Sequence, residues 1–308
     1  MIEPSFSIAA VERETGLSKD VLRIWERRYG FPVPERDGKG ERSYPAEQVE
    51  RLRLIKRLMD QGHRPGKLVA TPVEELSALA SRRAARAAAS KDDNGTAIEL
   101  AALLELIRQN DAAGFQQAMQ QRLAREGLQR FVQGTIAPLS SLVGEEWENG
   151  NIAVFEEHLF TELTKRLLRQ VIATMPGMRR SPRILLTSVP NEPHILGLLM
   201  VEALLALEGA ECIPLGTERP LLETSRAAIA HRADVVALSF SSAFPQRQIP
   251  GVMEQLRKVL PRGMQLWAGG AGVQRLGGIE EVQLLSSLDD ALKALADWRA
   301  DHPAVAGQ

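Results

Sequence analysis

The stretch Val189-Pro190-Asn191-Glu192-Pro193-His194-Ile195-Leu196-Gly197 decides how the C-terminal half of this 308-residue chain folds. It follows an apolar run over residues 183–189 and opens a second apolar segment, residues 198–207, that has helical spacing. Glu192 and His194 therefore lie in a predicted strand-to-helix loop. In an open parallel sheet such a loop lies at the carboxyl edge, where ligands bind. Pro193 restricts Glu192 to an extended conformation, so we expect the helix to begin after it.

His194 is a candidate metal ligand. A neutral imidazole binds a metal through one ring nitrogen while an acid holds the N–H of the other, and Glu192 stands two residues away. Gly197 lacks a Cβ, so a bulky group could approach the loop there. On this stretch alone, a solvated or hydrogen-bonded histidine is the alternative interpretation.

Two further elements follow, each at the end of a predicted strand. After Gly197 come 41 residues and then Ser239-Phe240-Ser241, and 27 residues later comes Gly269-Gly270. This spacing resembles the cobalamin-binding domain that takes its cofactor with histidine on cobalt, whose elements are Asp-x-His-x-x-Gly, Ser-x-Leu and Gly-Gly. The chain departs from it with Glu192 for Asp, as in a regulatory branch, and with Ser241 for Leu. The resemblance implies that His194 binds cobalt and that the cofactor contacts Glu192, His194, Gly197, Ser239, Ser241, Gly269 and Gly270.

The C-terminal region also has the overall pattern of an α/β domain. Strand-like runs near residues 183–189, 211–215, 234–240, 265–269 and 282–285 alternate with helical runs. This alternation predicts a doubly wound, five-stranded parallel sheet. Taken with the resemblance above, this implies that residues 180–300 form a flavodoxin-like, cobalamin-binding domain.

Composition excludes several classes of protein. Cys212 is the single cysteine, which excludes internal disulfides and any metal site built from several cysteines. No window of about 20 apolar residues occurs, and the N-terminus lacks a charged-then-apolar signal. The sequence therefore predicts a cytoplasmic protein without a membrane partner. The net charge of −1 is too small to indicate nucleic-acid binding by itself.

Residues 1–70 nevertheless have the pattern of a DNA-binding domain. Ser7 and Ser18 are candidate N-caps of two short helices, residues 8–14 and 19–28, with a glycine turn between them. Two such helices indicate a helix-turn-helix. A turn-rich hairpin over residues 35–44 and a third helix after it complete the prediction.

The run Leu22-Arg23-Ile24-Trp25-Glu26-Arg27-Arg28-Tyr29-Gly30, followed by Arg42-Ser43-Tyr44, resembles the MerR-type winged helix-turn-helix over residues 6–69. The resemblance implies that the second helix enters the major groove and that basic and aromatic side chains reach phosphates or bases. Arg27 and Arg28 fit a solvated charged face equally well. The candidate DNA-binding residues are Arg23, Arg27, Arg28, Arg42 and Tyr44.

Between these regions, residues 71–96 predict a short helix and a polar linker, and residues 97–176 predict a four-helix bundle. The third bundle helix, residues 128–147, contains Pro138 as a predicted kink. In the fourth helix an apolar stripe recurs at every fourth residue, and Glu157 and His158 lie off it, as on a solvated face. The stripe consists of Phe155, Leu159, Leu163, Leu167 and Val171.

Trp147, nine further residues and then Glu157-His158 resemble the Trp-x9-Glu-His motif of the CarH/LitR-type light-responsive repressors. In that family the bundle closes over the upper face of cobalamin. The resemblance implies that Trp147, Glu157 and His158 surround the adenosyl group. The residue after the Trp, which in the family can be a histidine that binds cobalt after illumination, is Glu148 here.

Together the segments predict a multidomain α and α/β protein. We expect a cobalamin-dependent, light-responsive repressor in which adenosylcobalamin controls oligomer state, dimer or tetramer, and binding to double-stranded operator DNA. A cobalamin enzyme is one rival, but no residues remain for the separate catalytic domain that cobalamin mutases and methyltransferases need. The other rival keeps the DNA domain and senses haem, another tetrapyrrole or a partner protein.

Overall fold

The structure, a computed structural model, describes residues 5–36, 40–60, 65–73, 75–76, 94–175 and 180–303. The chain forms two compact units, which divide after Asn94, and the segment Gly144–Ala153 groups with the N-terminal unit. The tip of the predicted hairpin and most of the predicted helix in residues 71–96 lie outside the described residues. No helix in the described part of the chain is long and apolar enough to cross a bilayer. The predicted domain boundaries stay predictions.

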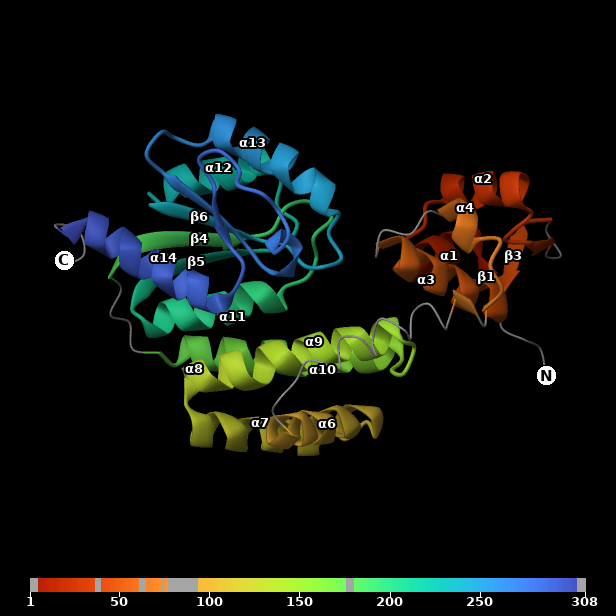
Figure 1. Cartoon of the computed structure of the whole chain (residues 1–308), viewed down its shortest axis with the longest axis horizontal. Coiled ribbons are helices and arrows are strands. Elements are labelled where there is room, and N and C mark those ends of the chain that lie inside the picture. Colours follow the sequence, from red (N-terminus) through yellow and green to blue (C-terminus); the bar gives the residue numbers. More distant parts are fainter. Residues whose placement is uncertain are drawn as a thin grey trace. The chain divides into compact units, whose positions relative to one another are not determined.

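The N-terminal unit combines a helix-turn-helix with a small antiparallel sheet (Figure 1). Its elements are β1 (Ser5–Ser7), α1 (Ile8–Thr15), α2 (Lys19–Tyr29), β2 (Glu35–Arg36), β3 (Arg42–Pro45), α3 (Ala46–Asp60) and α4 (Pro65–Leu68). Ser7 and Ser18 cap α1 and α2 through their side chains, and Gly16 and Gly30 end the helices in the left-handed region. The predicted helix-turn-helix and hairpin are confirmed.

The helical bundle belongs to the second unit, except for the end of one helix. Its segments are α6 (Asn94–Arg108), α7 (Ala112–Glu126), α8 (Leu128–Phe131), the π-helical turn η1 (Val132–Ile136), α9 (Ala137–Glu148) and α10 (Val154–Ala173). The predicted helix over residues 128–147 is thus interrupted before Pro138. Pro138 has no N–H, and its ring crowds the carbonyl four residues earlier, so a wider turn accommodates it. Within that turn Thr135 donates to Glu126 at 2.9 Å and accepts from Arg122 at 3.2 Å.

The apolar stripe predicted for α10 is partly wrong, because Phe155 is 59 % exposed. A strict four-residue repeat turns about 40° further round the helix at each step, so its members cannot all face the same neighbour. The buried face mixes spacings of three and four and packs against α7 and against α11 (Leu196–Leu207). Its buried residues are Phe160, Leu163, Thr164 and Leu168.

The sheet of the second unit has five parallel strands in the order β5-β4-β6-β7-β8. The strands are β4 (Arg180–Thr187), β5 (Ala210–Gly216), β6 (Val235–Ser239), β7 (Gln265–Gly269) and β8 (Gln283–Leu285), and the other helices are α12 (Leu221–Ala230), η2 (Gln246–Gln248), α13 (Ile249–Val259), η3 (Ala271–Val273) and α14 (Leu288–Asp301). Strand order reverses between β5 and β6, on either side of β4. This confirms the predicted doubly wound sheet.

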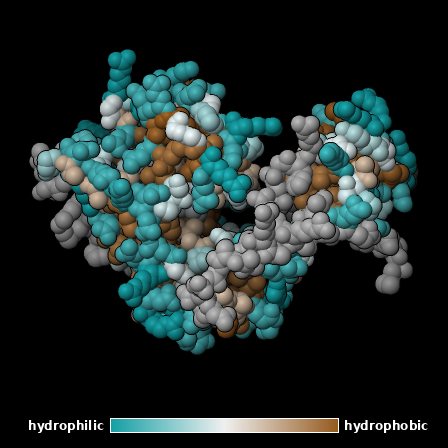
Figure 2. Space-filling model, in the orientation of Figure 1, coloured by the Kyte–Doolittle hydropathy of each residue, from teal (hydrophilic) through white to brown (hydrophobic). Residues whose placement is uncertain are grey.

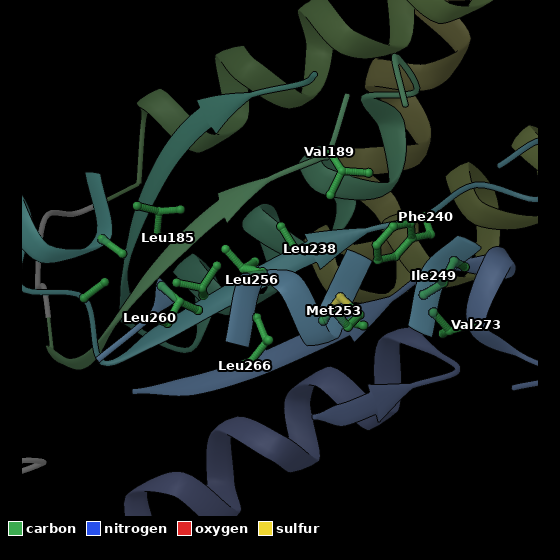
Figure 3. Close-up of a cluster of buried hydrophobic side chains, with 14 of the residues drawn as sticks. Leu185, Val189, Leu238, Phe240, Ile249, Met253, Leu256, Leu260, Leu266 and Val273 are labelled. Carbon is green, nitrogen blue, oxygen red and sulfur yellow. The ribbon is translucent and has the colours of Figure 1, made fainter. Parts of the chain in front are cut away.

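Alternation along the strands divides the core into two layers. Leu185, Leu238 and Leu266 point to the side covered by α12 and α13, where Met253 and Leu256 meet them (Figure 3). The alternate residues of the same strands point to the side covered by α11 and α14. Both faces of the sheet are therefore covered by helices, as is usual for a parallel sheet.

The core assignment makes a prediction about stability. Met253→Ala should lower the free energy of unfolding by about 2–5 kcal/mol, because Met253 is 0 % exposed and its loss leaves a cavity. Val259→Ala on the same helix is the matched control, since Val259 is 36 % exposed and should change stability much less. Urea denaturation measures both, and equal losses would contradict the two-layer core.

Candidate functional site

The loop between β4 and α11 is shaped by its own backbone. Asn191 has φ +66°, in the left-handed region that asparagine tolerates better than most residues. The N–H of Glu192 then donates to the carbonyl of Val189 at 3.1 Å, which closes a tight turn. The turn carries the Glu192 side chain inward, where it is 1 % exposed. As predicted, α11 begins after Pro193.

The Glu192 carboxylate is held from two strand ends. Its Oε1 lies 2.6 Å from Nδ1 of His194 and accepts the His194 backbone N–H at 3.2 Å. Its Oε2 accepts the backbone N–H and the hydroxyl of Ser241 at 2.7 and 2.9 Å. The Ser241 hydroxyl also lies 3.0 Å from Nδ1 of His194. Because β4 and β6 are neighbouring strands, the structure brings these three residues together at one edge of the sheet.

These contacts among Glu192, His194 and Ser241, here called the clamp, also affect the protonation of Glu192 and His194. Burial raises the pKa of the Glu192 carboxyl, but hydrogen bonds from His194 and Ser241 outweigh burial and the net pKa is lowered. The hydrogen bond to Glu192 raises the pKa of His194, against the effect of burial. No described residue bonds to Nε2 of His194, whose side chain is 55 % exposed. A single free imidazole nitrogen suits a metal that brings its other ligands with it, as in a tetrapyrrole.

The predicted glycines lie where chain segments meet most closely. A Cβ on Gly197 would lie 2.9 Å from the Ser239 hydroxyl oxygen. Gly270 has φ +100°, and a Cβ there would lie 2.4 Å from the carbonyl oxygen of Phe240, so this position requires glycine. Gly269 is less demanding, with ordinary contact distances to Leu285. These contacts bring the start of α11 and the end of β7 to the same strand end as the clamp.

Two further predicted site residues, Glu157 and His158, lie near the start of the bundle helix α10. The carboxylate of Glu157 contacts Nδ1 of His158 at 2.8 Å and accepts from Thr161 at 2.8 Å. The charge of Glu157 also contributes to the raised pKa of His194, after the larger effects of Glu192. His158 is more exposed than Glu157. Trp147 is half-buried near the end of α9 and groups with the N-terminal unit, so its approach to Glu157 stays a prediction.

In the N-terminal unit, the basic residues predicted to contact DNA differ in their surroundings. Arg23 lies 3.4 Å from Asp20, and Arg27 and Arg28 are exposed on the same helix. Arg42 on β3 donates to Glu26 of α2 at 2.9 Å, which ties the strand to the helix. This ion pair raises the pKa of Arg42, mainly through the hydrogen bond to Glu26. A contact between Arg42 and a phosphate stays a prediction.

The prediction that the Tyr44 side chain contacts DNA is wrong. Its side chain is 0 % exposed and belongs to the core formed with Leu22, Trp25 and Leu52. Tyr44 lies on β3, which packs against α1 and α3, and its side chain turns into the core with these helices. Burial, and then the charge of Glu26, raise the pKa of Tyr44. Its hydroxyl has no hydrogen-bond partner among the described residues.

Ser188 is a residue of the site that the sequence pattern does not single out. Ser188 is fully buried at the end of β4, donates its hydroxyl to the carbonyl of Glu192 and accepts the N–H of Glu218 at 2.9 Å. It therefore fastens the loop after β5 to the loop after β4. A serine ending an apolar strand is the only signal in the sequence, and it does not distinguish this role from an ordinary strand end.

Comparison with known proteins gives two family matches. Residues 6–68 match the MerR HTH family regulatory protein, and residues 99–172 match the B12 binding domain. The HTH-type transcriptional repressor CarH of Myxococcus xanthus is 30% identical over 278 residues, which are 89% of this chain and 91% of the relative. The HTH-type transcriptional repressor CarA of Myxococcus xanthus is 29% identical over 87% of each chain.

A solved structure gives the same fold. The monomethylamine corrinoid protein of Methanosarcina barkeri has a TM-score of 0.50 with 16% identity, and the match covers 63% of this chain and 96% of that one. At this level of identity the likeness concerns the fold of the bundle and sheet.

The paired shifts predict how the protein without bound metal responds to pH. The pKa of His194 is raised, so its stabilising contribution is present below its ordinary value and is lost as the pH rises through the folded value. The pKa of Glu192 is lowered, so its contribution is lost as the pH falls through the folded value. An NMR titration should find the pKa of the His194 imidazole above its ordinary value of about 6.5, and Glu192→Gln should lower that pKa. An unchanged imidazole pKa in that variant would contradict the clamp.

Proposed function

We propose that this chain, which belongs to the CarH family of MerR-type transcriptional repressors and carries a B12 binding domain, is a light sensor whose adenosylcobalamin controls binding to operator DNA. The observation that carries the proposal is the contact set of Glu192, His194 and Ser241, which holds Nδ1 of His194 at the end of the strands and leaves its half-exposed imidazole with Nε2 for a metal. When bound, adenosylcobalamin supplies a cobalt–carbon bond that visible light breaks.

We propose His194 as the lower ligand, through Nε2. Glu192 holds the other ring nitrogen, which fixes the tautomer that leaves Nε2 a lone pair. Ser241 in turn holds Oε2 of Glu192 through its N–H and hydroxyl, and the same hydroxyl contacts Nδ1 of the ring. The Leu-to-Ser departure at Ser241 therefore adds a donor to the clamp. Gly197, Ser239, Gly269 and Gly270 are proposed to border the rest of the cofactor.

We propose that Trp147, Glu157 and His158 surround the adenosyl group on the upper face of the cofactor. Glu157 accepts hydrogen bonds within its own helix, and the exposed His158 imidazole is available to a ligand. An indole supplies a flat apolar surface suited to an adenine ring. Glu148, next to Trp147, cannot replace a histidine as a neutral nitrogen ligand, so we propose that His194 remains the sole imidazole ligand after illumination.

DNA binding is assigned to the N-terminal unit, and control by the cofactor follows from thermodynamic linkage. A ligand shifts an assembly only by its difference in affinity for the two states. We propose that the loaded protein forms a homo-oligomer, dimer or tetramer, that presents two helix-turn-helix units to a two-part operator. Loss of the upper ligand then disfavours that assembly.

The proposal predicts a light effect that depends on His194. Protein loaded with adenosylcobalamin in the dark should bind a selected operator and release it after green light, with a matching change in absorption. His194→Ala should take up little cobalamin and should bind DNA equally in light and dark. His231→Ala, which changes an exposed histidine beyond the end of α12, is the matched control and should behave as wild type. A full light response in His194→Ala would contradict the ligand assignment.

The upper pocket predicts discrimination between two cobalamins. Trp147→Ala should weaken binding of adenosylcobalamin by about 10-fold or more, because an aromatic surface worth a few kcal/mol is lost. Binding of hydroxocobalamin, whose upper ligand is small, should change little. Paired titrations measure this, and a melting curve of the unloaded protein shows whether Trp147 supports the bundle instead. Equal losses for both cobalamins with a lowered melting temperature would refute the pocket role.

A further inference from the structure

The outward face of α2 carries one apolar side chain among charged ones. Leu22 and Trp25 turn into the core, whereas Ile24 is 45 % exposed. Asp20 and Arg28 stand four residues before and after Ile24, so they share its face. Arg23 and Arg27 are also exposed and adjoin that face. In Figure 2 the surface of this unit is mainly hydrophilic.

The charged neighbours of Ile24 favour an anionic partner. Three arginines surround Ile24. Asp20, the acidic residue on this face, pairs with Arg23 at 3.4 Å, and both of these side chains are largely exposed. Arg28 lies over the ring of Tyr29 at 5.3 Å from its centroid, which holds its guanidinium close to the helix. This face therefore presents positive charge to a DNA backbone on either side of an isoleucine.

An isoleucine at the centre of such a face has a restricted choice of partners in DNA. It has no hydrogen-bond donor or acceptor, so it cannot read the polar edge of a base. The C5-methyl group of thymine is the apolar group that the major groove presents. The second helix of a helix-turn-helix lies in that groove, and Ile24 is central in α2.

We propose that Ile24 is a specificity-determining residue that contacts the C5-methyl group of one thymine in each operator half-site. The contact removes apolar surface from water on both partners. The arginines around Ile24 supply affinity without sequence information, and Ile24 distinguishes thymine from the other bases at one position.

The test removes the methyl group alone. A duplex is first selected from a random pool by the full-length protein, in whichever form binds more tightly, and each thymine is then replaced singly by deoxyuridine. At one thymine per half-site, wild type should lose about fourfold in affinity, the value of one buried methyl group. Ile24→Ala should bind the original duplex more weakly and should show no further loss at that position.

Two control variants separate the outcomes. Ile98→Ala changes an exposed isoleucine of α6, 65 % exposed, and should keep the wild-type deoxyuridine profile. Arg27→Ala should weaken binding to all duplexes and reduce the salt dependence, also without changing that profile. Identical profiles for wild type and Ile24→Ala would overturn the proposal while leaving DNA binding intact. If the wild-type protein selects no sequence from the pool, the proposed DNA-binding function on which this inference rests is refuted, and the role of Ile24 is refuted with it.

Discussion

The cofactor end of this protein depends on keeping one carboxylate buried. A carboxylate removed from water is stable only where donors replace the water, and Glu192 receives them from His194 and from Ser241. The donors come from the ends of two neighbouring strands, β4 and β6, so the charge holds two loops in one arrangement. The clamp lies beside the place where the strand order reverses, which is where sheets of this kind bind ligands.

Much of this arrangement could be predicted because its causes are local. Ser7, Ser18 and Gly30 set the ends of their helices through their own side chains or backbone freedom. The alternation of apolar strands and helices leaves few topologies other than a doubly wound sheet. Neighbouring strand ends then bring Ser241 to Glu192, although 48 residues separate them in sequence.

Other features depend on tertiary contacts that no short stretch reveals. Tyr44 turns inward because β3 packs against α1 and α3, and Phe155 turns outward because the neighbours of α10 meet a different face. The hydroxyl of Ser188 finds its partners in two separate loops. Motif spacing singled out Glu192, His194 and Ser241, which contact one another, whereas Trp147 falls in the segment that groups with the N-terminal unit.

The stiffness of the loop before α11 has a consequence for the entropy of ligand capture. Pro190 and Pro193 have a fixed φ, Asn191 is set in the left-handed region, and Glu192 is held at both oxygens. Ordering a flexible residue costs about 1–2 kcal/mol, and here that cost falls on folding rather than on binding. A ligand that used this loop would therefore meet a surface that is already ordered and would change it little. A structural response to such a ligand would have to come from segments outside the loop.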